Sequence, residues 1–157
     1  EAKDGIRLVG DTDLSESAFS TEHLADTTIS SCLFTQLVEQ QPMGFSNDHE
    51  AIVTFRAAHL DMLLRTTKPG GTVYFVTDMV SNLTVRQLKS ISKEQLNGFL
   101  SNSISQRNFF TGTNPFGALQ QLKSDPRVAR ATLLDAWKWE LGPRVFAVYG
   151  IQAEVKI

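Results

Sequence analysis

The chain has 157 residues, of which 41% are hydrophobic and 20% charged, and a formal net charge of −2. This length leaves room for one domain with a sizeable core. Neither a cluster of Lys and Arg nor an apolar run near the roughly 20 residues of a membrane span occurs, so we expect no nucleic acid and no membrane as partners.

Strand-like and helix-like segments alternate along the first half of the chain. Residues 6–9 (IRLV) are a short apolar strand candidate. Residues 27–34 (TTISSCLF) form a second one, because β-branched residues favour strands. A polar loop follows, and residues 50–65 are the best helix candidate, with Asp48 as the expected N-cap.

The next segment is the most informative one. A Pro-Gly-Gly turn at residues 69–71 ends the helix and reverses the chain. Residues 72–77 are a continuous apolar run, which is typical of a strand buried on both faces of a parallel sheet. Open parallel sheets bind ligands beyond the carboxyl ends of their strands. Thr77, Asp78 and Ser81 are therefore the first residues to inspect for chemistry.

The second half predicts two helices and a hairpin. Residues 84–99 have helical spacing, residues 108–117 are a phenylalanine-rich loop, and residues 117–123 are a short helix. Residues 132–141 and 144–155 are strands joined by Gly-Pro, which indicates an antiparallel hairpin. The alternation predicts an α/β fold.

Four features occur in a fixed order: a strand ending in Gly10-Asp11, a strand entered through Asp26, a Pro-Gly-Gly turn before a buried strand, and a closing hairpin. This ordered set resembles the carboxyl-terminal part of a class I S-adenosylmethionine-dependent methyltransferase. The resemblance covers most of the chain.

The resemblance implies a single domain over residues 1–157 with a Rossmann-like, mostly parallel sheet and a terminal antiparallel hairpin. The final strand, residues 145–155, would lie between residues 72–77 and 134–141. Residues 105–126 look like an insertion that covers the acceptor. The family's first strands and glycine-rich cofactor loop have no counterpart, since five residues precede the first strand. We therefore expect the amino-terminal strands to be absent and the chain to be a fragment.

The resemblance also implies cofactor contacts. Asp11 corresponds to the acid near the adenine ring, and Ser31 and Cys32 lie where the family holds the methyl donor. S-adenosylmethionine would then be the cofactor of the full-length protein and would bind this chain alone weakly or not at all. Asp11 is equally expected as a turn residue, and a lone cysteine such as Cys32 is more often inert core than nucleophile.

The acceptor would be a small molecule. Thr35 and Gln36, just past a strand end, are placed to orient it, and Phe109, Phe110 and Asn114 of the aromatic loop are placed to cover it. The alternative for that loop is a satellite hydrophobic cluster.

His49, beside the loop over the predicted cleft, is the weak candidate for a general base. The three histidines, His23, His49 and His59, are not at metal-ligand spacing, so no metal site is predicted. His59 lies on the helix predicted at residues 50–65 and is expected at the boundary between core and surface.

Three functions stay open. The first is methyl transfer to a small-molecule acceptor, with this chain alone inactive. The second is a non-catalytic binding or interaction module, and the third is a nicotinamide-dependent enzyme, which the missing glycine fingerprint disfavours. The missing neighbours of strand 27–34 would expose its edge, so we expect a homo-oligomer. One cysteine fits a reducing compartment and a cytoplasmic location.

Overall fold

The computed structural model describes residues 24–157. The predicted strand at residues 6–9 and the candidate cofactor residue Asp11 lie outside the described residues. The described strands are β1 (Ala25–Ser31), β2 (Thr67–Ser81), β3 (Val128–Leu133), β4 (Trp137–Leu141) and β5 (Arg144–Val155). The helices are α1 (Leu33–Glu39), α2 (His49–Arg65), α3 (Lys93–Ser105) and α4 (Pro115–Ser124), with short 3-10 helices η2 (Phe45–Asn47) and η3 (Arg86–Ser90).

The five strands form one mixed sheet in the order β1-β2-β5-β3, and β4 also pairs with β5. Only β1 and β2 are parallel, whereas β2, β3 and β4 all run antiparallel to β5. The prediction of a mostly parallel, Rossmann-like sheet is therefore wrong.

The physical reason lies in β2. Val73 and Phe75 are fully buried, but Tyr74 and Val76, which follow them in alternation, are only half-buried. The apolar run thus alternates between a covered and a partly open face, as antiparallel sheets allow. Hydrophobic residues on both faces do not by themselves require helices on both faces.

The predicted place of the final strand is confirmed. In β5, Ile151 pairs with Phe75 of β2 on one side and with Leu133 of β3 on the other. The predicted hairpin is also present, since Leu141 of β4 pairs with Arg144 of β5. The single strand predicted at residues 132–141 is instead two strands, because residues 134–136 leave the ladder.

Other boundaries also differ from the prediction. The strand predicted at residues 72–77 runs from Thr67 to Ser81, so Asp78 lies within β2 rather than beyond its end. The strand predicted at residues 27–34 ends at Ser31, because Cys32 adopts a left-handed conformation with φ 51° and α1 begins at once. The helix predicted at residues 84–99 is split into η3 and α3, because Ser92 forms a capping box with Gln95 and starts a new helix. The predicted N-cap of α2 is confirmed by the bond from Ala51 N to the Asp48 carboxylate, at 3.0 Å.

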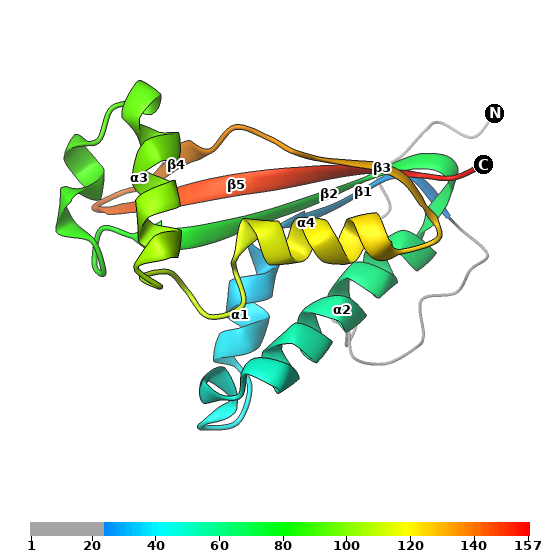
Figure 1. Cartoon of the computed structure of the whole chain (residues 1–157), viewed down its shortest axis with the longest axis horizontal. Coiled ribbons are helices and arrows are strands. Elements are labelled where there is room, and N and C mark those ends of the chain that lie inside the picture. Colours follow the sequence, from blue (N-terminus) through cyan, green and yellow to red (C-terminus); the bar gives the residue numbers. More distant parts are fainter. Residues whose placement is uncertain (1–23) are drawn as a thin grey trace.

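The helices are distributed unevenly over the sheet. Figure 1 shows α2 and α4 along the same side of the sheet, with α1 crossing near α2, while α3 lies at the far end beside β4. The covered face carries the main core, which includes Phe34, Leu60, Phe75 and Ile151. The opposite face of β1 exposes Ile29, which is 62% accessible.

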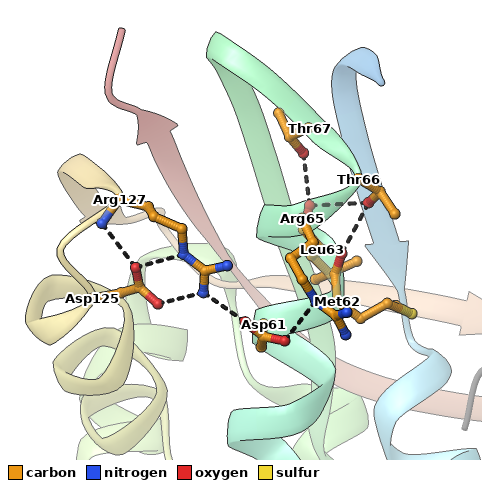
Figure 2. Close-up of polar contacts among 8 residues, drawn as sticks. All are labelled: Asp61, Met62, Leu63, Arg65, Thr66, Thr67, Asp125 and Arg127. Carbon is orange, nitrogen blue, oxygen red and sulfur yellow. Dashed lines mark hydrogen bonds and ion pairs between the residues drawn. The ribbon is translucent and has the colours of Figure 1, made fainter. Parts of the chain in front are cut away.

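Hydrogen bonds and ion pairs connect the elements at the end of the sheet where α2 is followed by β2. The side chains of Thr66 and Thr67 both donate to the Leu63 carbonyl, at 3.0 and 2.7 Å. Nearby, Arg127 bridges Asp61 of α2 and Asp125 after α4, each at 2.7 Å (Figure 2). These bonds hold α2 and the α4–β3 turn together at this end.

Pro69, Gly70 and Gly71 do not form a turn before the strand but lie within β2, at an irregularity in its pairing with β1. Gly71 gives the first testable prediction. A Cβ on Gly71 would lie 2.8 Å from the Asp26 carbonyl and 2.9 Å from the Lys68 carbonyl, both backbone atoms that cannot move aside. We expect Gly71→Ala to lower the free energy of unfolding by about 1–3 kcal/mol in urea denaturation.

The matched control for this substitution is Gly98→Ala in α3. No atom lies within 4 Å of the position that its Cβ would occupy. Alanine also restricts the unfolded chain, so this change should raise the free energy of unfolding by about 0.4–1 kcal/mol. Equal effects of the two substitutions would contradict the close approach at Gly71.

Candidate functional site

The candidate site lies at the carboxyl end of the parallel pair. Ser31, the last residue of β1, pairs with Val76 of β2, and Asp78 lies two residues further along. The chain turns sharply after β1, where the Cys32 amide donates to the Val76 carbonyl at 2.8 Å. This turn carries α1 across the end of β2.

A buried hydrogen bond joins the two elements at this edge. The Thr35 hydroxyl of α1 donates to Oδ1 of Asp78 at 2.6 Å, and both residues are less than 10% exposed. Burial raises the pKa of Asp78, and the Thr35 bond counteracts only part of that effect. Among residues 24–157, no basic side chain forms an ion pair with this carboxylate. The site therefore holds a poorly solvated acid that readily accepts a proton.

Cys32 lies beside this pair but is a poor nucleophile. Burial, together with the nearby Asp78 carboxylate, raises the pKa of its thiol to about 11. The thiol is therefore protonated at neutral pH, and only the thiolate is strongly nucleophilic.

The phenylalanine-rich loop closes over the same edge. The Phe110 amide donates to the Met79 carbonyl at 2.8 Å, directly after Asp78. Arg56 of α2 donates to the Gly112 carbonyl at 2.6 Å, and Gly112 has φ +81°. A Cβ on Gly112 would lie 2.6 Å from a methyl group of Ile52. The loop is thus tied to the sheet and packed tightly on α2.

A cavity of about 370 Å³ lies between α1, the loop at residues 40–46 and the aromatic loop. Its volume falls within the range of small-molecule sites. Thr35 lines it together with Val38, Glu39, Gln41, Pro42, Met43, Gly44, Ser46, Phe110 and Thr111. Thr35 thus links the cavity to Asp78.

The structure brings together only some of the predicted acceptor residues. Thr35 and Phe110 line the same cavity. Gln36 is exposed and is not among its lining residues, and Phe109 packs against the core. Asn114 caps α4 by accepting from the amides of Phe116 and Gly117.

The other predicted site residues do not line the cavity. Ser31 is exposed at the edge of β1, and Cys32 is half-buried. His49 is exposed at the start of α2. The sequence pointed to Asp78 as a residue just past a strand, whereas the structure places it inside β2, paired with Val148 of β5. The bond to Thr35, which joins residues 43 positions apart, was not predicted.

His59 is buried rather than at the boundary between core and surface. Its Nε2 shares a 2.8 Å hydrogen bond with the Ser30 hydroxyl, and its ring packs against Phe34 and Phe75. Burial lowers the pKa of His59 to about 4, so the imidazole is neutral at physiological pH. It lines neither described cavity, and its contacts assign it to the core.

Within the described part of the chain, no group of three or more His, Cys, Asp or Glu side chains could hold a metal ion. Between residues 24 and 157, no helix is long and apolar enough to cross a bilayer. Comparison with known proteins finds no matching family model and no matching curated protein.

Asp78→Asn tests the state of the buried carboxyl group. Since burial raises the pKa of Asp78 above its ordinary value of 3.8, the folded chain holds this proton more tightly than the unfolded chain. The contribution of Asp78 to stability is complete below pH 3.8 and is lost as the pH rises through the folded-state pKa. Asn does not titrate. We therefore expect the melting temperature of Asp78→Asn, relative to that of the wild type, to increase as the pH rises from 3.8 through the folded-state pKa.

Thermal unfolding followed by circular dichroism measures this difference at each pH. Asp26→Asn is the matched control, because it makes the same substitution at a side chain that is 87% exposed and paired with Lys68, where an ion pair contributes little to stability. A constant difference between Asp78→Asn and the wild type across the window would contradict a raised pKa.

Proposed function

We propose that this chain is the acceptor-binding part of a cytoplasmic S-adenosylmethionine-dependent methyltransferase that acts on a small molecule. The observation that carries the proposal is the Thr35–Asp78 hydrogen bond of 2.6 Å beside a cavity of about 370 Å³. The strand order supports it as well, because β5 lies antiparallel between β2 and β3, as the resemblance implied.

The chain's own residues would bind the acceptor and take up its proton. An acceptor hydroxyl in the cavity would donate to the Thr35 oxygen, whose own proton already points at Asp78. As the acceptor oxygen loses its proton to Thr35, the Thr35 proton passes to the Asp78 carboxylate. Burial raises the pKa of Asp78 and so moves it toward neutral pH, the direction that favours a general base.

S-adenosylmethionine, when bound, would supply the electrophilic methyl group. The described residues do not by themselves fit this cofactor. Ser31 and Cys32 lie at the expected edge, but neither lines the cavity, and residues 24–157 contain no glycine-rich turn after a strand that could hold its ribose and carboxylate. The cofactor contacts are therefore assigned to residues beyond those described.

Methyl transfer is tested on the protein expressed from its whole open reading frame, with radiolabelled S-adenosylmethionine and a panel of small phenols, acids and amines. We expect Asp78→Asn to lower the rate by about 100-fold or more, because it removes the base. Thr35→Val should have a similar effect. Asp26→Asn, which removes an exposed carboxylate, should have none.

Calorimetry on the 157-residue chain alone completes this test. We expect its dissociation constant for S-adenosylmethionine to be weaker than roughly 100 μM. Low-micromolar binding would contradict the assignment of the cofactor contacts to other residues. Absence of both binding and transfer in the whole protein would reject methyl transfer itself.

The open edge of β1 favours a second candidate function, an interaction module without catalysis. β1 pairs only with β2 among the described strands, and Ile29 on it is exposed. An unpaired edge with an apolar side chain and no charge in its centre is a template for pairing with another strand. Two copies of the chain joined at β1 would satisfy it.

Light scattering tests this association. We expect the wild-type chain to form a dimer and Ser31→Lys or Ile29→Lys to shift it toward the 17.4 kDa monomer, because a charge on the edge discourages pairing. Thr132→Lys, at an exposed position of β3, is the control and should not change the mass. A wild-type monomer that is indifferent to these substitutions excludes the dimer.

A further inference from the structure

The cavity at Thr35 has a second polar region, one helical turn away from the Thr35 hydroxyl. Thr35 and Glu39 both line the cavity, and they lie four residues apart on α1. Residues at this spacing share one face of a helix, with roughly 5–6 Å between their Cβ atoms. Val38, which also lines the cavity, is 9% exposed and supplies an apolar surface beside them. One small molecule in the cavity can therefore contact both Thr35 and Glu39.

The region around Glu39 is rich in hydrogen-bond acceptors. The Glu39 carboxylate forms no ion pair within residues 24–157. Gln41, another lining residue, is half-buried, and its side-chain nitrogen donates to the Leu37 carbonyl at 3.1 Å. Because that bond engages the nitrogen, the Gln41 side-chain oxygen remains as an acceptor. A ligand group in this region must therefore be a donor.

The charge of the cavity points the same way. Glu39 is its one charged lining residue, and no Lys, Arg or His is among the others. A second acid, Asp78, lies directly behind Thr35 and accepts its hydroxyl proton. A protonated amine carries three donors and no acceptor, and its hydrogen bonds to a carboxylate are stronger than those between neutral groups. The cavity therefore favours a cationic ligand over a neutral or an anionic one.

We propose that the cavity at Thr35 binds a small molecule with two polar ends, a hydroxyl that bonds to Thr35 and a protonated amine that bonds to Glu39. An apolar body joins the two ends and lies against Val38 and Phe110, which also line the cavity. The inference rests on the proposed function, because it takes this molecule to be the methyl acceptor. A carboxylate or phosphate in place of the amine would be repelled by Glu39, and an uncharged group would leave Glu39 without a counter-ion.

A second cavity, of about 180 Å³, is the competing place for such a molecule. It lies between α3, the start of α4 and the segment that joins β3 to β4, and it shares no lining residue with the cavity at Thr35. Its one acid, Asp135, already accepts from the Asn97 side chain at 3.4 Å. Glu39 and Asp135 are both exposed carboxylates that line a cavity. Asp135 is therefore the matched control position.

Ligand-observed NMR titration of the 157-residue chain tests the proposal with tyramine, 4-propylphenol and phenethylamine. Tyramine carries both polar ends, 4-propylphenol replaces the ammonium by a methyl group of nearly the same size, and phenethylamine lacks the hydroxyl. We expect tyramine to bind about tenfold more tightly than either of the others. Glu39→Gln keeps the shape of the side chain and should abolish the preference over 4-propylphenol, while leaving the affinity for 4-propylphenol unchanged. Asp135→Asn should leave the preference intact.

Circular dichroism verifies that each variant is folded. A preference for tyramine that survives Glu39→Gln, or that Asp135→Asn removes, overturns the proposal, and so does the absence of saturable binding to the wild type. The methyl-transfer assay separates this inference from the proposed function. Transfer to neutral phenols with no Glu39-dependent preference for an amine would reject this inference and keep methyl transfer. Glu39-dependent binding of tyramine without any transfer would confirm the amine site and reject methyl transfer.

Discussion

The packing of Phe34 is the constraint on which the candidate site depends. Its ring is fully buried and meets Phe75 of β2 edge-on at 5.9 Å between centroids, and it also contacts Phe55 and His59 of α2. The aromatic loop packs on its other side, at Gly112. One side chain thus locks α1 onto the sheet, α2 and the loop. Because Thr35 follows Phe34 in α1, its hydroxyl is set against Asp78 as a consequence.

The neighbouring Ser30–His59 bond shows how polar groups are accommodated beneath the sheet. Each of the two side chains satisfies the other at 2.8 Å, so neither leaves an unpaired atom in the core. The imidazole stays neutral, because a charge there would lose its hydration without gaining a carboxylate. The pair therefore joins β1 to α2 without a buried ion pair. In a buried ion pair, the free energy of desolvation often cancels the attraction between the charges.

Local sequence signals predicted much of the fold and little of the site. Asp48 marked the start of α2, and Gly142-Pro143 marked the β4–β5 hairpin, because caps and turns depend on a few adjacent residues. The direction of strand pairing was missed, since an apolar run fits either a parallel or an antiparallel neighbour. The Thr35–Asp78 bond was missed for another reason: it arises only after Cys32 turns the chain left-handed, which no local preference of cysteine predicts.

The polar groups that pack imperfectly are not scattered through the core. Asp78, with one hydroxyl donor and no ion-pair partner among residues 24–157, and Tyr149, with no described partner, both lie near the aromatic loop. Ser30 and His59, by contrast, bond to each other at 2.8 Å. Selection for stability alone tends to pair or replace buried polar groups. Asp78 lies beside the cavity at Thr35, and proteins accept such a cost in stability where function requires it.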